Sequence, residues 1–201
     1  MAPDVRTDRG LDRLVNFTDA AVAIAITILV LPLVDIASDS GDTRLGDVLA
    51  DHADTFIAFL VTFAVIARLW VAHHQLFERL RSYDSVVVWL VLLWLGCIVM
   101  LPFAAQELSN LYSSDPWVFV LYIGLVTVSS ASLALVSVRI ARRPELRASD
   151  SPDAHDAGRW ITTILLLAAL GLVLLVPWPG MFWLLLLLLS GPVEKLWARR
   201  R

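Results

Sequence analysis

Long apolar blocks alternate with short polar stretches along the chain, and this pattern predicts membrane-spanning helices. A helix needs about 20 mostly apolar residues to cross the hydrocarbon core of a bilayer. Six blocks approach or exceed that length, at residues 14–36, 53–71, 86–105, 117–140, 160–176 and 181–196. We therefore expect an all-α polytopic membrane protein, organised as a single six-helix transmembrane domain over residues 1–201.

Two features of the blocks refine this expectation. The last two are separated only by Pro177, Trp178, Pro179 and Gly180, whose turn chemistry predicts a tight helical hairpin. The first block follows a mixed-charge stretch and is too long for the apolar region of a cleaved signal peptide. We expect it to remain as the first span.

The basic residues predict the orientation. With six spans, 14 of the 16 lysines and arginines fall on one side of the membrane, whereas Arg44 lies alone on the other side and Arg68 lies within the second span. Cytoplasmic loops of membrane proteins carry such an excess of positive charge. Both termini are therefore predicted to be cytoplasmic.

Composition narrows the function classes. With 58% hydrophobic and 17% charged residues, the chain is more apolar than soluble domains usually are. The net charge of −3 gives no general attraction to nucleic acid, and Cys97 is the single cysteine, so no disulfide framework or thiolate metal site is expected. The chain has no Gly-x-Ser-x-Gly elbow and no phosphate-cradling glycine loop, so we expect no enzyme, no cofactor and no metal site.

The first span carries the candidate chemistry. Asp19 lies inside its apolar run and must pair, protonate or meet water, and Arg13 lies about a turn and a half away. At about 100° per residue, one stripe collects Ile24, Ile28 and Leu31. Asp35 continues this stripe at the outer end, and Thr27 borders it.

Several copies of this helix around an axis would stack the three apolar residues as rings over roughly 10 Å. Asp35 would then form an acidic mouth at the extracellular end. Acidic rings attract cations, and apolar constrictions gate by dewetting. Considered alone, a branched apolar stripe is more often a packing surface than a pore, and both interpretations remain open at this point.

One motif in the first span resembles a known family. The sequence Arg13-x-x-x-Phe17-Thr18-Asp19 is similar to the Arg-x-x-x-Phe-Ser-Asp signature of the endolysosomal potassium channel family (transmembrane protein 175), and specifically to its single-repeat prokaryotic members. Thr18 replaces the usual serine and keeps the hydroxyl. The following Ala-Ile-Ala-Ile-Thr-x-Leu-Val-Leu run and the sequence Trp70-x-x-His73-His74 match as well.

The resemblance implies a homotetramer in which the first helix lines a potassium-permeable pore. Ile24 would form the narrowest ring, Ile28 and Leu31 would follow outward, and Thr27 would supply a hydroxyl layer linked to potassium preference. The filter would consist of apolar side chains; no Thr-Val-Gly-Tyr-Gly carbonyl filter is present. The motif residues would hold the helices together around the pore: Arg13, Phe17, Thr18 and Asp19.

Three residues end the second block: Trp70, His73 and His74. Adjacent histidines point about 100° apart on a helix and cannot readily share one metal ion. We expect an interfacial tryptophan with histidines hydrogen-bonded to the first helix, and more sharply that one histidine meets Asp19 or Thr18. Pro32 is expected to bend the outer third of the first helix.

The sequence thus predicts a passive potassium-permeable channel in the lipid bilayer of a bacterial plasma membrane, with potassium and other monovalent cations as candidate permeant ions. Two alternatives remain. One is a proton-coupled secondary transporter in which Asp19 or a histidine titrates, although broken helices around a midplane site and internal repeats are not evident. The other is a non-conducting accessory protein in which the first helix serves only oligomerisation.

Overall fold

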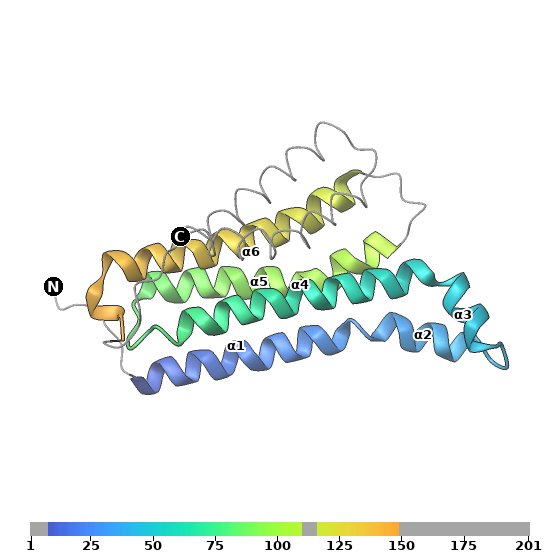
Figure 1. The fold of residues 1–201 in the computed structure, drawn as a ribbon, viewed down its shortest axis with the longest axis horizontal. Helices are drawn as coiled ribbons and strands as arrows, with labels where there is room; N and C mark the ends of the chain where they lie inside the picture. Colours follow the sequence, from blue (N-terminus) through green and yellow to red (C-terminus); the bar gives the residue numbers. More distant parts are fainter. Residues whose placement is uncertain (1–7, 110–115, 149–201) are drawn as a thin grey trace, which may run out of the picture.

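The structure, a computed structural model, describes residues 8–109 and 116–148, and this part of the chain is entirely helical apart from its turns. Figure 1 shows the helices lying side by side along one long axis. Their bounds are α1 Asp8–Ile28, α2 Leu31–Asp39, α3 Leu45–Asp51, α4 Ala53–Phe77, α5 Ser85–Ser109, α6 Pro116–Arg142 and the short 3-10 turn η1 Pro144–Leu146.

Four stretches are long and apolar enough to cross a membrane: Arg9–Asp39, Ala53–Phe77, Ser85–Ser109 and Trp117–Arg142. They contain the first four predicted blocks, each extended by a few residues at its ends. The all-α prediction is thereby confirmed for the described chain. The blocks at 160–176 and 181–196, and the hairpin between them, lie outside the described residues.

The first span is two helices rather than one. Residues 29 and 30 form a turn in which the Val30 amide donates to the Thr27 carbonyl at 3.2 Å, and α2 then begins with proline at its second position. Pro32 has no amide hydrogen, so it cannot continue the α1 hydrogen-bond ladder, but it suits the first turn of a new helix. The bend expected from Pro32 is present as a break. Gly41, at a φ of +53°, then makes the left-handed turn toward α3.

The core lies between α5 and α6, which contact each other more extensively than any other pair of described helices. Val87, Val91, Trp94, Ile98 and Leu101 recur along α5 at helical spacing and are all fully buried. The hydroxyl residues of α6 support this packing, because Thr127, Ser132 and Ser137 donate to carbonyls of their own helix. These hydroxyls are satisfied within their own helix, which lets α6 pack closely against its neighbours.

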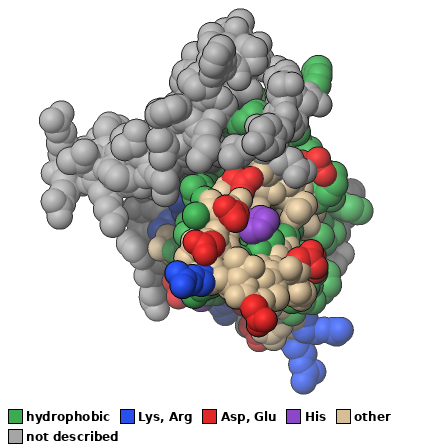
Figure 2. All heavy atoms as spheres, turned by 90° about the vertical axis from the view of Figure 1, so that its right-hand side faces the viewer, with side chains coloured by type: hydrophobic (Ala, Val, Ile, Leu, Met, Phe, Trp, Pro, Cys, Tyr) green, Lys and Arg blue, Asp and Glu red, His purple; other side chains and the backbone are tan. Residues whose placement is uncertain are grey.

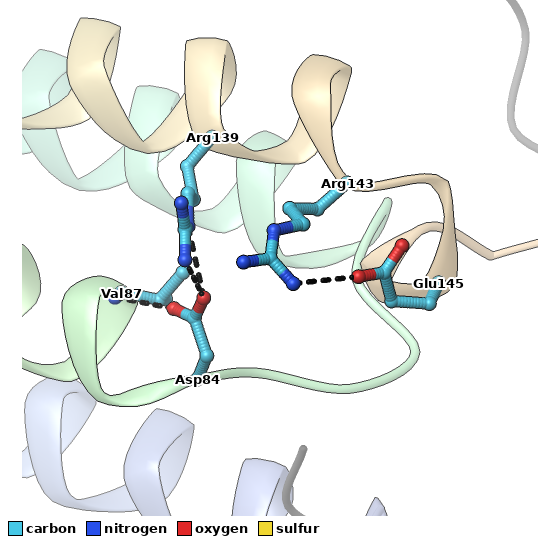
Figure 3. A network of polar contacts seen from close by, with 5 residues as sticks. All are labelled: Asp84, Val87, Arg139, Arg143 and Glu145. Carbon is cyan, nitrogen blue, oxygen red and sulfur yellow. Dashed lines mark hydrogen bonds and ion pairs between the residues drawn. The ribbon is translucent and has the colours of Figure 1, made fainter. Parts of the chain in front are cut away.

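A partly buried ion pair fastens the start of α5 to the end of α6 (Figure 3). Asp84 is the residue before α5; its Oδ1 accepts the Val87 amide at 3.0 Å and its Oδ2 accepts Nε and Nη2 of Arg139 at 2.9 and 2.6 Å. The Asp84 carboxylate thus caps the start of α5 and neutralises the charge of Arg139 in the last turn of α6. Arg143 makes a separate pair with Glu145 at 3.0 Å on the surface nearby.

The turn between α4 and α5 is also tied to its surroundings through the backbone. The Arg81 amide donates to the Leu146 carbonyl, and the Ala148 amide donates to the Arg79 carbonyl, each at 3.0 Å. At Gly10 of α1, an added methyl group would lie 2.5 Å from the Tyr83 hydroxyl oxygen, so a larger residue there would have to displace the end of the Tyr83 side chain.

Two substitutions of Asp84 are expected to destabilise the fold to different extents. Asp84→Ala removes the cap and leaves the Arg139 charge partly buried without its partner, which we expect to cost about 3 kcal/mol or more. Asp84→Asn keeps an acceptor for the Val87 amide, so it should lose only part of this free energy of unfolding. Thermal unfolding in detergent micelles measures the difference.

The matched control is Glu145→Gln. The backbone amide of Glu145 itself and the Arg143 guanidinium lower the pKa of this carboxyl, so it is charged at neutral pH, but its pair with Arg143 is solvent-exposed. Exposed pairs contribute little. Equal melting temperatures for Asp84→Ala and Glu145→Gln would contradict the role assigned to Asp84.

Candidate functional site

The α1 helix buries one narrow stripe and exposes the opposite face. Its buried residues are Leu11, Thr18, Val22, Ala25 and Leu29, which recur every three, four or seven positions. This stripe packs against α5 and α4. Small and β-branched residues on it allow the close helix contact typical of membrane proteins.

The predicted constriction residues lie on the exposed face. Ile24 is 60% exposed, Leu31 56% and Ile28 43%. Figure 1 shows that α1 and α2 form one edge of the described bundle. A row of large apolar side chains at the edge of the subunit is available to lipid or to other copies of the chain.

The polar residues predicted beside this stripe are exposed as well. Thr27 is exposed, and its hydroxyl donates to the Ile24 carbonyl at 2.7 Å. Asp35 is exposed on α2, a little more than one turn beyond the break. Exposed apolar residues thus lie on both sides of the break, and Asp35 is an exposed acidic residue on the outer side.

The four signature residues divide between the two faces of α1. Arg13 and Phe17 are exposed, and Phe17 shows 55% of its surface. Thr18 is fully buried; its hydroxyl donates to the carbonyls of Val15 at 2.8 Å and Leu14 at 3.1 Å. The hydroxyl is thus satisfied within its own helix, which lets Thr18 pack in an apolar interface without an unpaired group.

Asp19 joins α1 to α4. Its Oδ1 accepts the indole Nε1 hydrogen of Trp70 at 2.8 Å, and both side chains are partly buried. A carboxylate inside a spanning segment requires a partner, and this charge-assisted bond supplies one. Within the described residues no ion pair joins Arg13 to Asp19, and the indole of Trp70 is the hydrogen-bond partner of this carboxylate.

The histidines take positions other than those expected. His73 is fully buried and stacks on Trp94 at a ring-centroid distance of 4.3 Å and on Phe77 at 4.2 Å. No described residue accepts from or donates to its ring nitrogens. His74 stacks on Trp70 and lies 3.4 Å from a carboxylate oxygen of Glu78.

The expectation that a histidine meets Asp19 or Thr18 is therefore wrong, because Trp70 occupies that position. His74 instead supports the indole that binds Asp19. Among the residues that the structure describes, no group of three or more His, Cys, Asp or Glu side chains is arranged to hold a metal ion.

The two ends of the bundle carry opposite charge. We call the end at which α1 begins and α4 ends the arginine end; its described basic residues are Arg9, Arg13, Arg79, Arg81, Arg139, Arg142, Arg143 and Arg147. The opposite end, the acidic end, faces the viewer in Figure 2 and shows acidic side chains around a histidine. Its acidic residues are Asp35, Asp39, Asp42, Asp47, Asp51, Asp54 and Glu107, and Arg44 is the basic residue there within the described ranges.

Comparison with known proteins gives one family. Residues 13–102 match the model of the family described as Endosomal/lysosomal potassium channel TMEM175. This range contains the signature motif, the exposed stripe of Ile24, Ile28 and Leu31, the Trp70 and histidine contacts, and the first two-thirds of α5.

Named relatives agree with this match. A potassium channel of Streptomyces collinus is 31% identical over 103 residues, which are 51% of this chain and 50% of that protein. A potassium channel of a Chryseobacterium species is 28% identical over 128 residues, 64% of each chain. The mouse endosomal/lysosomal proton channel TMEM175 is 30% identical over 113 residues, 53% of this chain and 23% of that protein. The chain thus spans half to somewhat under two-thirds of these bacterial relatives and about a quarter of the mouse protein.

Removing the indole donor is expected to loosen α1. Trp70→Phe keeps the ring but leaves the Asp19 carboxylate without its hydrogen bond, which should cost about 2 kcal/mol of unfolding free energy. Asp19→Asn keeps an acceptor for the indole and should cost less. Trp89→Phe, at a 72% exposed tryptophan of α5, is the matched control. Thermal unfolding in micelles checks the order, and a Trp70→Phe variant as stable as Trp89→Phe would contradict it.

Proposed function

The chain belongs to the endosomal/lysosomal potassium channel TMEM175 family, and from this membership we propose that it is a passive potassium-permeable cation channel. Several copies form the pore, each contributing its first helix. The observation that carries the proposal is the exposed apolar stripe on α1 and α2, at the edge of the subunit. The bacterial relatives named potassium channels support the choice of ion.

We propose a homotetramer with six spans per subunit and the α1 stripes facing a common axis. The narrow buried stripe of α1 supports this arrangement, since it leaves the face with Phe17, Ile24 and Ile28 exposed and able to contact other subunits. Ile24 forms the narrowest ring, and Ile28 and Leu31 form the rings toward the acidic end. The row then ends at Asp35, whose carboxylates concentrate cations at the mouth.

Conduction in this arrangement follows from hydration. Water and ions avoid a narrow ring of isoleucine side chains, so the pore closes by dewetting and needs no plug. A small outward shift of α1 admits a partly dehydrated ion. Potassium is less tightly hydrated than sodium, so it loses less hydration free energy when it passes the ring. The Thr27 hydroxyls beside the ring then replace part of the water that potassium has lost.

The signature residues hold this arrangement together and do not filter ions. Asp19 binds Trp70, and Thr18 packs in the interface between α1 and its neighbours. Arg13 and Phe17 are exposed on the free side of α1, where they are placed to contact an adjacent subunit.

The charge distribution supports an orientation in the plasma membrane of a bacterium. The arginine end faces the cytoplasm, together with both termini, and the acidic end faces outward. Cations approaching from outside would first meet the carboxylates shown in Figure 2.

Proton permeation is a second candidate, because the vertebrate relatives are named proton channels. The same pore would serve both ions. Flux measured with a pH gradient and no potassium gradient distinguishes the two, since a potassium channel without proton conduction leaves the internal pH unchanged.

Substituting the narrowest ring should increase conduction. We expect Ile24→Asn to raise potassium flux through reconstituted protein several-fold or to reduce its preference over sodium, because polar side chains hydrate the constriction. Leu60→Asn is the matched control, since Leu60 on α4 is also 60% exposed. Identical flux and selectivity in wild type and Ile24→Asn would contradict the assignment of the constriction.

The stoichiometry is a separate prediction. Native mass spectrometry of the full chain in mild detergent is expected to show four subunits. A monomer or dimer that still conducts potassium would rule out a pore built from four first helices.

A further inference from the structure

A small pocket of about 110 Å³ lies between the start of α5 and the end of α6. Its described lining residues are Asp84, Ser85, Val86, Arg139, Arg143, Glu145 and Leu146. Ser85 begins one stretch able to cross a membrane, and Arg142 ends another. The pocket therefore lies where two spans leave the hydrocarbon core, which is the level of the lipid head groups.

Two guanidinium groups meet in this pocket. Arg139 donates Nε and Nη2 to Asp84, and Arg143 donates Nη1 to Glu145. Figure 3 shows the other amino nitrogen of Arg143 directed toward Arg139 and away from Glu145. Within the described part of the chain, this nitrogen and Nη1 of Arg139 make no hydrogen bond. The pocket thus brings unused N–H donors of two guanidinium groups to one space.

The two carboxylates of the pocket are held differently. Asp84 accepts three hydrogen bonds, and its side chain is only 10% exposed. Glu145 accepts one from Arg143, and 46% of its side chain is exposed. Exposed ion pairs contribute little to stability, so Glu145 can leave Arg143 at small cost. Another anion can therefore replace Glu145 as the partner of Arg143, whereas Asp84 stays in place.

The surroundings of the pocket favour an anion. Arg142 is exposed next to Arg143, and the Arg81 amide binds the carbonyl of Leu146, which lines the pocket. Together with Arg139, these arginines outnumber the two carboxylates, and the N-terminal end of α5 adds a partial positive charge. A pocket of this volume holds a few water molecules. It therefore admits a phosphate group, while the rest of a lipid would remain outside.

An exposed apolar strip leads away from the pocket along α5. Val86 lines the pocket and is 45% exposed, and Trp89 and Leu93 follow at 72% and 51%. Spacings of three and four residues place these side chains on one face of the helix. Because this face belongs to a stretch able to cross a membrane, the strip suits an acyl chain and favours a lipid phosphate over a free one.

From these observations we propose that the pocket binds the phosphate group of an anionic phospholipid. Phosphate oxygens accept hydrogen bonds from the unused amino nitrogens of Arg139 and Arg143, in charge-assisted contacts that suit arginine. The phosphate takes the place of Glu145, and one acyl chain lies along the apolar strip of α5. The described lining residues come from α5, α6, η1 and the residues beside them, so the site is away from the α1 stripe. Its occupancy is measured without conduction and does not depend on the proposed function.

Native mass spectrometry of the full chain in mild detergent tests the site, with lipid added back after delipidation. Phosphatidylglycerol is expected to fill one tight site per subunit. Phosphatidylcholine should bind at least about tenfold more weakly, because its choline group cancels the phosphate charge. Equal binding of the two lipids would overturn the proposal. So would displacement of phosphatidylglycerol by an equal concentration of inorganic phosphate, because the acyl chain would then contribute nothing.

Three substitutions separate the pocket from a general attraction to the arginine end. Arg143→Gln removes one guanidinium and should weaken phosphatidylglycerol binding about tenfold, whereas Arg9→Gln, at an exposed arginine of α1, should leave it unchanged. Glu145→Gln removes the competing carboxylate and should strengthen binding several-fold. Equal effects of Arg143→Gln and Arg9→Gln, or weaker binding after Glu145→Gln, would show that the phosphate does not lie in this pocket.

A fourth substitution tests the path of the acyl chain. Leu93→Asn places an amide in the apolar strip and should weaken phosphatidylglycerol binding several-fold. Leu60→Asn, at a leucine of α4 that is 60% exposed, is the matched control and should bind the lipid as wild type does. Equal binding by these two variants would rule out an acyl chain along α5.

Discussion

The free face of α1 is the constraint on which the rest of the structure depends. A membrane-spanning helix satisfies its own backbone, so it needs neighbours only for its side chains. α1 places Thr18, Val22, Ala25 and Leu29 against its subunit and leaves Ile24 and Ile28 outside. Lipid covers apolar side chains as well as protein does, so burial alone gives this helix little affinity for the bundle. Its position therefore depends on a few directional contacts.

The bond between Asp19 and Trp70 is the main such contact. It is charge-assisted, it lies inside a spanning segment, and its loss leaves a carboxylate in an apolar region. The stacking of His74 on Trp70 restrains the indole further. Thr18 contributes differently, because its hydroxyl is satisfied within α1 and permits close packing without fixing the helix to a partner.

Much of this arrangement could be predicted from residue spacing, and some of it could not. Helical periodicity places Ile24, Ile28 and Leu31 together, and the structure exposes all three; the lack of an amide hydrogen in Pro32 predicts the break that ends α1. The partner of Asp19 depends on how α4 is rotated about its own axis. The stacking of His73 on Trp94 of α5 accompanies that rotation, and no local pattern specifies this contact between helices. The pair of Asp84 and Arg139 joins residues 55 positions apart, so it follows only from the antiparallel contact of α5 with α6.

These contacts divide the subunit into a rigid part and a more weakly held part. α5 and α6 share the buried core, and the Asp84 carboxylate fastens their adjoining ends through a cap and an ion pair. α1 has a single narrow interface, a break at residues 29 and 30, and a cavity beside that break. A displacement of the segment beyond the break disturbs few buried contacts, because α2 has no buried residue. If the α1 stripe lines a pore, the part of the protein that must move to open it is therefore the part whose movement costs least, and the rigid pair of α5 and α6 provides the frame against which it moves.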